Sequence, residues 1–357
     1  MLSRAIKRAF LPVIGIMGVI VFTSCLPPLG RSCVNNKPLR TLNAHGLEVT
    51  AVAFSPNGKI LASGGQSDKV VIVREGSVIR KLQDTDYTVK LWSTSTWRPL
   101  HILHHVELID CLAFSPSGEF LAVGVGGIDT GTVKVWRTAT AQLAHSLRIY
   151  THSPLPGVNA IVFSPDGKWL ATGSADSKVR LWSTTTWRPL RIISLSGVAT
   201  SISFSPDGKL LATASWDHAI RIWSTTISKE VKLLQQPYSR QLSDITTVVT
   251  FSPDGKMLAT ATDNQPVKLW NAATGKEVNV FRGHSDSISA VTFSPDGKTL
   301  ATASLDTTVK LWSVTTGREL LTLKGHTAPV YSVDFSPDGK TLATASRDGT
   351  VKIWNVL

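Results

Sequence analysis

A cassette of phenylalanine, serine and proline, followed by a polar residue and a glycine, occurs seven times in this chain of 357 residues. Five of the seven copies read FSPDGK, and successive copies are separated by 60, 49, 41, 47, 42 and 42 residues. A period near 42 indicates a supersecondary unit that stacks on copies of itself, because one such unit is too small to bury its own apolar face. The copies begin at Phe54, Phe114, Phe163, Phe204, Phe251, Phe293 and Phe335.

Each unit is predicted to contain four short strands. In the most regular unit, Ile288 to Phe293 reads as a strand that ends at a turn with proline and glycine at suitable positions. Extended structure resumes over Thr299 to Ser304, returns over Thr308 to Trp312 with a period of two, and ends over Leu320 to Leu323. Four antiparallel strands in 42 residues are typical of a propeller blade.

These motifs resemble those of the WD-repeat β-propeller family. The resemblance rests on the pairs Gly283-His284 and Gly325-His326, the FSPDGK turn, the Ser-x-Asp triplet that starts at Ser304, and the closing VKLW or VKIW. It runs from about residue 38 to the C-terminus, although no copy keeps the aspartate that normally follows the tryptophan. The family implies an all-β fold, a seven-bladed propeller of four-stranded antiparallel blades.

The ends of the chain predict how the ring closes. The chain stops at Leu357, just past the third strand of the seventh unit, and the missing fourth strand is found near the N-terminus as Pro38 to Leu42. Pairing the two ends in the last blade would leave no open sheet edge. We therefore expect one propeller domain over residues 38–357, closed by its N-terminal strand.

The first unit is irregular because 60 residues separate its phenylalanine from the next. Lys69 to Val73 and Thr88 to Trp92 both read as the third strand, and the second is the better copy because Asp86 precedes its tryptophan by six residues. We therefore predict an irregular partial-repeat insertion over residues 74–92 of the first blade rather than an eighth blade.

The N-terminus predicts export. Arg4, Lys7 and Arg8 precede an apolar run from Ala9 to Phe22, which has the order of a secretory signal and is short for a membrane span. Residues 1–24 are predicted to be a signal peptide or membrane anchor, and residues 25–37 a linker. The segment that ends at Cys25 also resembles a bacterial lipoprotein signal, which makes Cys25 a candidate lipidation site. Lipidation, simple cleavage and an uncleaved anchor stay open, and all three place the propeller outside the cytoplasm, in or beyond a bacterial envelope.

The charge of the chain bears on its partners. The formal net charge of +12 falls to +9 if residues 1–24 are removed, since three basic residues and no acid leave with them. Most of the remaining lysine and arginine recurs at fixed positions of the repeat, which is typical of a solvated ring whose side-chain stems cover apolar neighbours. An exported protein of this charge would favour anionic envelope surfaces, and the signal argues against a nucleic-acid ligand. Nothing implies an obligate oligomer.

Recurrent serine, histidine and aspartate residues could be mistaken for a hydrolase triad. The resemblance to the family implies instead a buried hydrogen-bond relay, and its occurrence in two consecutive units with a tryptophan in each supports that interpretation. No motif for a cofactor or a metal ion appears, and we predict no catalytic residue. The relay residues are His284, Ser304, Asp306 and Trp312 in the sixth unit, and His326, Ser346, Asp348 and Trp354 in the seventh.

Large side chains at the turns are the candidate partner-binding residues. The loops between units share one rim with the second turn of each blade, and the first and third turns share the other. Aromatic side chains near basic ones have the composition of a recognition patch, although Trp97 and Trp187 could simply stack on Pro99 and Pro189. The candidates are Trp216, Arg347 and Tyr331 on the first rim and Trp97, Trp187 and Trp169 on the second.

Two function classes follow. The first is a non-enzymatic, membrane-associated scaffold whose rims bind a protein or a cell-envelope polymer. The second is an exported propeller enzyme or small-ligand binder with a site at the mouth of the central channel. The innermost strands carry mainly small and apolar residues, and Asp110 and Asp334 are the exceptions. The scarcity of inward-facing acids favours the scaffold.

Overall fold

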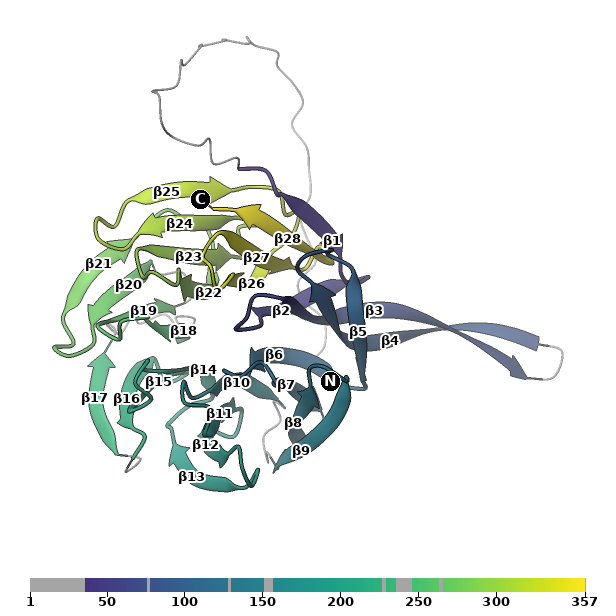
Figure 1. The fold of residues 1–357 in the computed structure, drawn as a ribbon, viewed down its shortest axis with the longest axis horizontal. Coiled ribbons are helices and arrows are strands. Elements are labelled where there is room, and N and C mark those ends of the chain that lie inside the picture. Colours follow the sequence, from purple (N-terminus) through teal and green to yellow (C-terminus); the bar gives the residue numbers. More distant parts are fainter. Residues whose placement is uncertain are drawn as a thin grey trace, which may run out of the picture. The chain divides into compact units, whose positions relative to one another are not determined.

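The computed structural model describes residues 36–75, 78–127, 130–150, 157–226, 229–235, 246–262 and 266–356. These residues form seven four-stranded antiparallel sheets within one compact unit, Val34–Leu357. Figure 1 shows the sheets following one another around a ring, with the first strand of each sheet innermost. The seven-bladed all-β propeller is confirmed. The predicted signal or anchor over residues 1–24 and Cys25 lie outside the described residues.

Blades three to six are regular, and each takes its four strands in sequence order. Their strands are β10 (Val158–Phe163), β11 (Trp169–Ser174), β12 (Lys178–Ser183) and β13 (Pro189–Ser194); β14 (Ala199–Phe204), β15 (Leu210–Ser215), β16 (Ala219–Ser224) and β17 (Glu230–Gln235); β18 (Thr246–Phe251), β19 (Met257–Thr262), β20 (Val267–Asn271) and β21 (Glu277–Phe281); and β22 (Ile288–Phe293), β23 (Thr299–Ser304), β24 (Val309–Ser313) and β25 (Glu319–Leu323).

The seventh blade joins the two ends of the propeller. It contains β26 (Val330–Phe335), β27 (Thr341–Ser346) and β28 (Thr350–Asn355), and its outer strand is β1 (Arg40–Asn43). Arg40 lies opposite Ile353, and the Leu39 amide donates a hydrogen bond of 2.7 Å to the Ile353 carbonyl oxygen. The predicted closure by the N-terminal strand is thus confirmed, and Figure 1 shows β1 beside β28.

The first two blades have lengthened hairpins between their second and third strands. Blade one contains β2 (Glu48–Phe54), β3 (Ile60–Glu75), β4 (Val78–Ser93) and β5 (Pro99–His105), and blade two contains β6 (Leu108–Phe114), β7 (Phe120–Gly127), β8 (Thr130–Arg137) and β9 (Gln142–Tyr150). In Figure 1 the β3–β4 hairpin extends beyond the other blades.

The expected insertion over residues 74–92 has the wrong bounds. Within β4, Thr88–Trp92 is the regular third strand, because it pairs with β3 on one side and with β5 on the other. β3 and β4 stay paired from Ile60 opposite Ser93 to Glu75 opposite Val78, so the additional residues form the outer part of this hairpin. Lengthening both strands together keeps their backbone groups hydrogen-bonded, which a one-sided loop would not do.

The core of the propeller lies between the blades. Six clusters of buried apolar side chains each combine the phenylalanine and tryptophan of one blade with small and branched residues of the blade before it. In the cluster between blades one and two, the phenylalanine and tryptophan, Phe114 and Trp136, are half-buried and pack against it. The cluster that joins blades seven and one includes Phe54, Trp92, Val351 and Ile353. Each blade is therefore stabilised mainly by its neighbours, as expected for a repeat fold.

The FSPDGK cassette is explained by the turn that it forms. In blade six the Ser294 hydroxyl donates to Asp296 Oδ1 at 2.6 Å and accepts from the Thr299 amide at 3.0 Å, while the Lys298 amide donates to Asp296 Oδ1 at 3.0 Å. Gly297 has a φ of 70°, a left-handed conformation that favours glycine. The cassette fixes a turn, so its recurrence carries information about architecture.

Candidate functional site

The relays of blades six and seven are buried chains of hydrogen bonds. In blade six the Trp312 indole N–H donates to Thr302 Oγ1 at 2.9 Å, and Thr302 Oγ1 lies 2.8 Å from His284 Nε2. His284 Nδ1 lies 2.7 Å from Asp306 Oδ2. Blade seven repeats the chain, with Trp354 Nε1 2.9 Å from Thr344 Oγ1, Thr344 Oγ1 2.7 Å from His326 Nε2, and His326 Nδ1 2.8 Å from Asp348 Oδ2.

Ser304 and Ser346 are not members of these chains, contrary to the prediction. Trp312 lies opposite Leu300, and Thr302 is two positions further along β23. Ser304 is a further two positions away, about 6.7 Å at the rise of a strand, and is out of reach of the indole. Its hydroxyl donates instead to the Asp286 carbonyl oxygen at 3.1 Å and accepts from the Asp306 amide at 3.1 Å.

The sequence does contain a signal for the missing hydroxyl. A serine or threonine stands nine residues after the cassette phenylalanine in six of the seven units. It accepts the indole hydrogen bond in all six blades concerned. These residues are Ser63, Thr172, Thr213, Thr260, Thr302 and Thr344.

The chemistry of the relay is structural. Burial would raise the pKa of Asp306, but hydrogen bonds from Thr308 and His284 outweigh it and hold this pKa below its usual value. Burial lowers the pKa of His284, so the neutral ring donates from Nδ1 to the carboxylate and accepts at Nε2. Both ring nitrogens are thereby occupied, and the histidine has no free nitrogen with which to activate a nucleophile.

In blades three and four an arginine binds the aspartate that follows the second strand. Arg180 donates to Asp176 Oδ2 at 2.6 Å and to the Ser174 hydroxyl at 3.0 Å, and Arg221 lies 2.7 Å from Asp217. The arginine comes from the strand that carries the tryptophan. It lies two residues before the tryptophan and four residues after the aspartate.

Blade two keeps the histidine and the tryptophan but lacks the hydroxyl between them. Val123 stands where the other blades have serine or threonine, and His105 and Trp136 meet edge to face with ring centroids 5.5 Å apart. Neither ring nitrogen of His105 nor Trp136 Nε1 has a hydrogen-bond partner among the described residues. Burial, with a smaller effect of Lys134, lowers the pKa of His105 to about 3.

Asp110 and Asp334 do not form a common site. They lie on β6 and β26, in blades that are separated by blade one, and burial raises the pKa of each to about 7. Asp334 Oδ2 accepts a hydrogen bond of 2.8 Å from the Phe54 amide in the next blade. The Ser203 hydroxyl likewise accepts a hydrogen bond of 3.1 Å from the Phe251 amide. The residue before the cassette phenylalanine thus links adjacent blades. Among the described residues no cluster of three potential metal ligands is found.

The candidate partner-binding residues do not gather in one patch. Trp216 is 41% exposed in blade four, and Arg347 is exposed in blade seven beside half-buried Tyr331. Burial and the charge of Glu48 raise the pKa of Tyr331. Trp97, Trp169 and Trp187 are half-buried and pack against three different inter-blade clusters.

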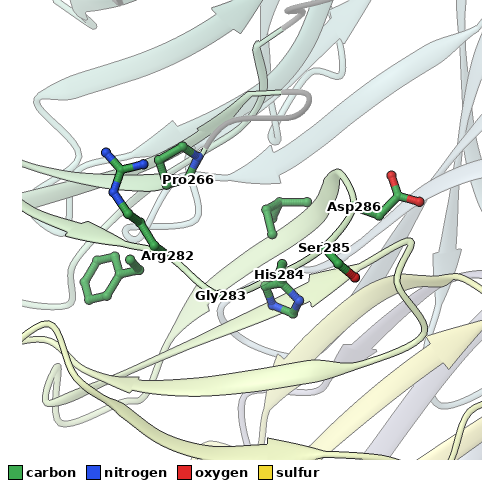
Figure 2. A pocket seen from close by; sticks show the side chains of 8 residues that line it. Pro266, Arg282, Gly283, His284, Ser285 and Asp286 are labelled. Atoms are coloured by element: carbon green, nitrogen blue, oxygen red, sulfur yellow. The ribbon is translucent and has the colours of Figure 1, made fainter.

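A cavity of about 270 Å³ lies beside the relay of blade six. Figure 2 shows Arg282 and Pro266 on one side of it and Ser285 and Asp286 on the other, with His284 between them. His284 is already hydrogen-bonded within the relay, so the groups of this cavity that can meet a ligand are mainly those of its rim.

Within the described residues, no helix has the length and apolar character needed to cross a membrane.

A family model described as "WD domain, G-beta repeat" matches seven segments of the chain, residues 36–74, 97–137, 144–183, 187–224, 234–271, 275–313 and 317–355. The first match ends after Lys69 to Val73, the alternative third strand, whereas the structure uses Thr88 to Trp92. The unmatched residues between the first two segments include all of β4 and the turn that follows it.

The chain is similar to curated proteins from an insect and from fungi. It is 28% identical over 145 residues to small ribosomal subunit protein RACK1 of Drosophila melanogaster, an alignment that covers 39% of this chain and 38% of that protein. It is 34% identical over 147 residues to protein hir1 of Schizosaccharomyces pombe, an alignment that covers 41% of this chain and 15% of that protein. It is 29% identical over 138 residues to pre-rRNA-processing protein IPI3 of Mycosarcoma maydis, an alignment that covers 38% of this chain and 20% of that protein. The chain thus spans less than two-fifths of these relatives.

The seven matched segments span more than half of the chain and recur with the blades of the propeller, so the chain belongs to the WD40 family of WD-domain, G-beta-repeat proteins.

Proposed function

We propose that this WD40 propeller is a non-enzymatic interaction scaffold, exported and membrane-associated, whose rims bind a protein or a cell-envelope polymer. One observation carries the proposal: large side chains that depart from the repeat, such as Trp97 and Trp216, stand at the turns, whereas the histidine and aspartate residues that could support catalysis are engaged in relays. Exposed aromatic and arginine side chains are the usual centres of protein interfaces.

Export and anchoring rest on the N-terminal sequence. Basic residues, an apolar run and Cys25 in that order support a bacterial lipoprotein or another envelope-attached form. Labelling with a palmitate analogue, compared between the wild type and Cys25→Ser, tests the anchor. Label that persists in Cys25→Ser contradicts lipidation at this cysteine.

The binding function is tested by capture from a native envelope extract. We expect a partner that the wild type retains and that is lost with Trp216→Ala plus Arg347→Ala on one rim, or with Trp97→Ala on the other. Lys298→Ala, in an exposed turn that the proposal does not use, is the matched control. If the wild type, the rim variants and the control retain the same proteins and polymers, the rims are not the binding surfaces.

The alternative is an exported enzyme or small-ligand binder with a site at the channel mouth. Its support is the raised pKa of Asp110 and Asp334, since perturbed carboxyl groups are common in active sites. A hydrolase substrate panel with added divalent metals tests it. Catalysis that disappears in Asp110→Asn or Asp334→Asn would favour the enzyme over the scaffold.

A further inference from the structure

The turn sequence Thr-Trp-Arg-Pro-Leu occurs twice and places its tryptophan in an unusual backbone conformation. Trp97 has a φ of 57° and Trp187 a φ of 55°. Gly275 and Gly317 take the same place in blades five and six, with φ of 73° and 70°. A bulky residue in the left-handed region costs about 1–2 kcal/mol, so contacts of the indole must offset that cost.

Trp187 has such contacts. Its indole stacks on His145 with ring centroids 4.6 Å apart, and it meets the edge of Phe120 at 5.6 Å and an interplanar angle of 76°. Phe120 is the first residue of β7 and His145 belongs to β9, so blade two supplies both rings to the turn of blade three. The space beside this tryptophan is filled by the chain itself.

Trp97 stands at the equivalent place between blades seven and one, but the two rings are missing. Thr341, the first residue of β27, takes the place of Phe120. Arg40 takes the place of the histidine, because it lies opposite Ile353 in the same way as His145 lies opposite Val135. A cavity of about 490 Å³ lies there, with Trp97, Thr341, Pro56 and Pro337 among its walls. This volume is within the range of ligand pockets.

We propose that the cavity beside Trp97 receives a phenylalanine or tyrosine side chain of a partner protein. The molecule itself supplies the template, because Phe120 occupies the corresponding space at the other junction and packs edge to face on the same turn tryptophan. The inference rests on the proposed scaffold function and specifies the chemistry of its partner.

The charges around the cavity favour acidic residues next to that aromatic side chain. The charged residue among the walls is Asp338, which nearby Lys340 offsets. Lys59 and Arg98 are exposed and follow the wall residues Gly58 and Trp97 directly in sequence, so the surplus charge here is positive. Blade one has Asn57 in place of the turn aspartate, so Lys59 lacks the carboxylate that pairs with the corresponding lysine in blades three, five and six at 3.6 to 3.7 Å. An acidic segment would be attracted to this edge, and the attraction would weaken as salt is added.

The test uses the full chain and a labelled acidic pentapeptide with a central phenylalanine, measured by fluorescence anisotropy. We expect this peptide to bind about tenfold or more tightly than the same peptide with a central alanine. Thr341→Phe fills the cavity as Phe120 does at the other junction, and should abolish the preference without loss of thermal stability. Thr299→Phe, the same change between blades six and seven, is the matched control and should leave binding unchanged.

Trp97→Gly is the second variant, since it restores the residue found in blades five and six and removes the backbone strain. We expect it to keep the fold, because glycine takes this φ without strain, and to lose the preference for phenylalanine. Equal binding of the two peptides, no binding at all, or full binding by Thr341→Phe would each overturn the inference. The scaffold function would then still be judged separately, by the dependence of partner capture on Trp216 and Arg347.

Discussion

Blades two and seven each contain a buried histidine next to a tryptophan, but they differ in what lies between the two rings. In blade seven Thr344 connects Trp354 to His326, and Asp348 holds the other ring nitrogen. In blade two Val123 takes the place of the threonine, and the rings of His105 and Trp136 touch without a hydrogen bond. In blade seven the Thr344 hydroxyl thus pairs two buried polar atoms and Asp348 a third, which makes the relay a device for pairing polar groups within the core.

The largest effect is expected from breaking the intact relay. Thr344→Val should destabilise the protein by about 4 kcal/mol, because it leaves Trp354 Nε1 and His326 Nε2 buried without partners, at about 1–3 kcal/mol each. Urea unfolding followed by tryptophan fluorescence measures the change. Thr315→Val, at an exposed turn position, is the control. Equal midpoints for the two variants would show that the relay contributes nothing to stability.

A second effect should appear in the pH dependence of stability. The pKa of His105 is lowered to about 3 in the folded protein by burial, against about 6.5 when unfolded, so the unfolded state binds more protons between these values. Stability should therefore fall as the pH is lowered through this window, by about 3 kcal/mol between pH 6.5 and 4 for this group alone. His105→Leu should unfold with a shallower dependence on pH.

His104→Leu is the control, because it also removes a histidine, but one whose side chain is exposed. His45, whose pKa burial lowers to about 4, adds a similar acid sensitivity in blade one and should be unaffected by either variant. If wild type and His105→Leu lose stability in parallel on acidification, then His105 is not buried as a neutral ring.

The sequence predicts the blades well because their information is local and repeated. The FSPDGK turn is specified by hydrogen bonds within six residues, and closure by β1 follows from counting strands. The relay was only partly predictable, since choosing between Thr302 and Ser304 requires the register of two strands. The environment of Trp97 could not be predicted, because an identical turn sequence meets Phe120 at one junction and Thr341 at the other.

The smallest effect, and the sharpest test of the comparison, is a gain of stability in blade two. Val123→Thr places a hydroxyl where Thr344 stands in blade seven, opposite Lys134 as Thr344 lies opposite Lys352. It can accept from Trp136 Nε1 and donate to a ring nitrogen of His105, and two new hydrogen bonds minus the cost of burying a hydroxyl should yield about 1 kcal/mol. The gain should vanish in the His105→Leu background, where the hydroxyl loses one of its partners, and a double-mutant cycle measures that coupling. Val123→Thr could instead lower stability with either residue at position 105. That result would mean that blade two has repacked around the valine, and that its two rings form an apolar contact instead of an incomplete relay.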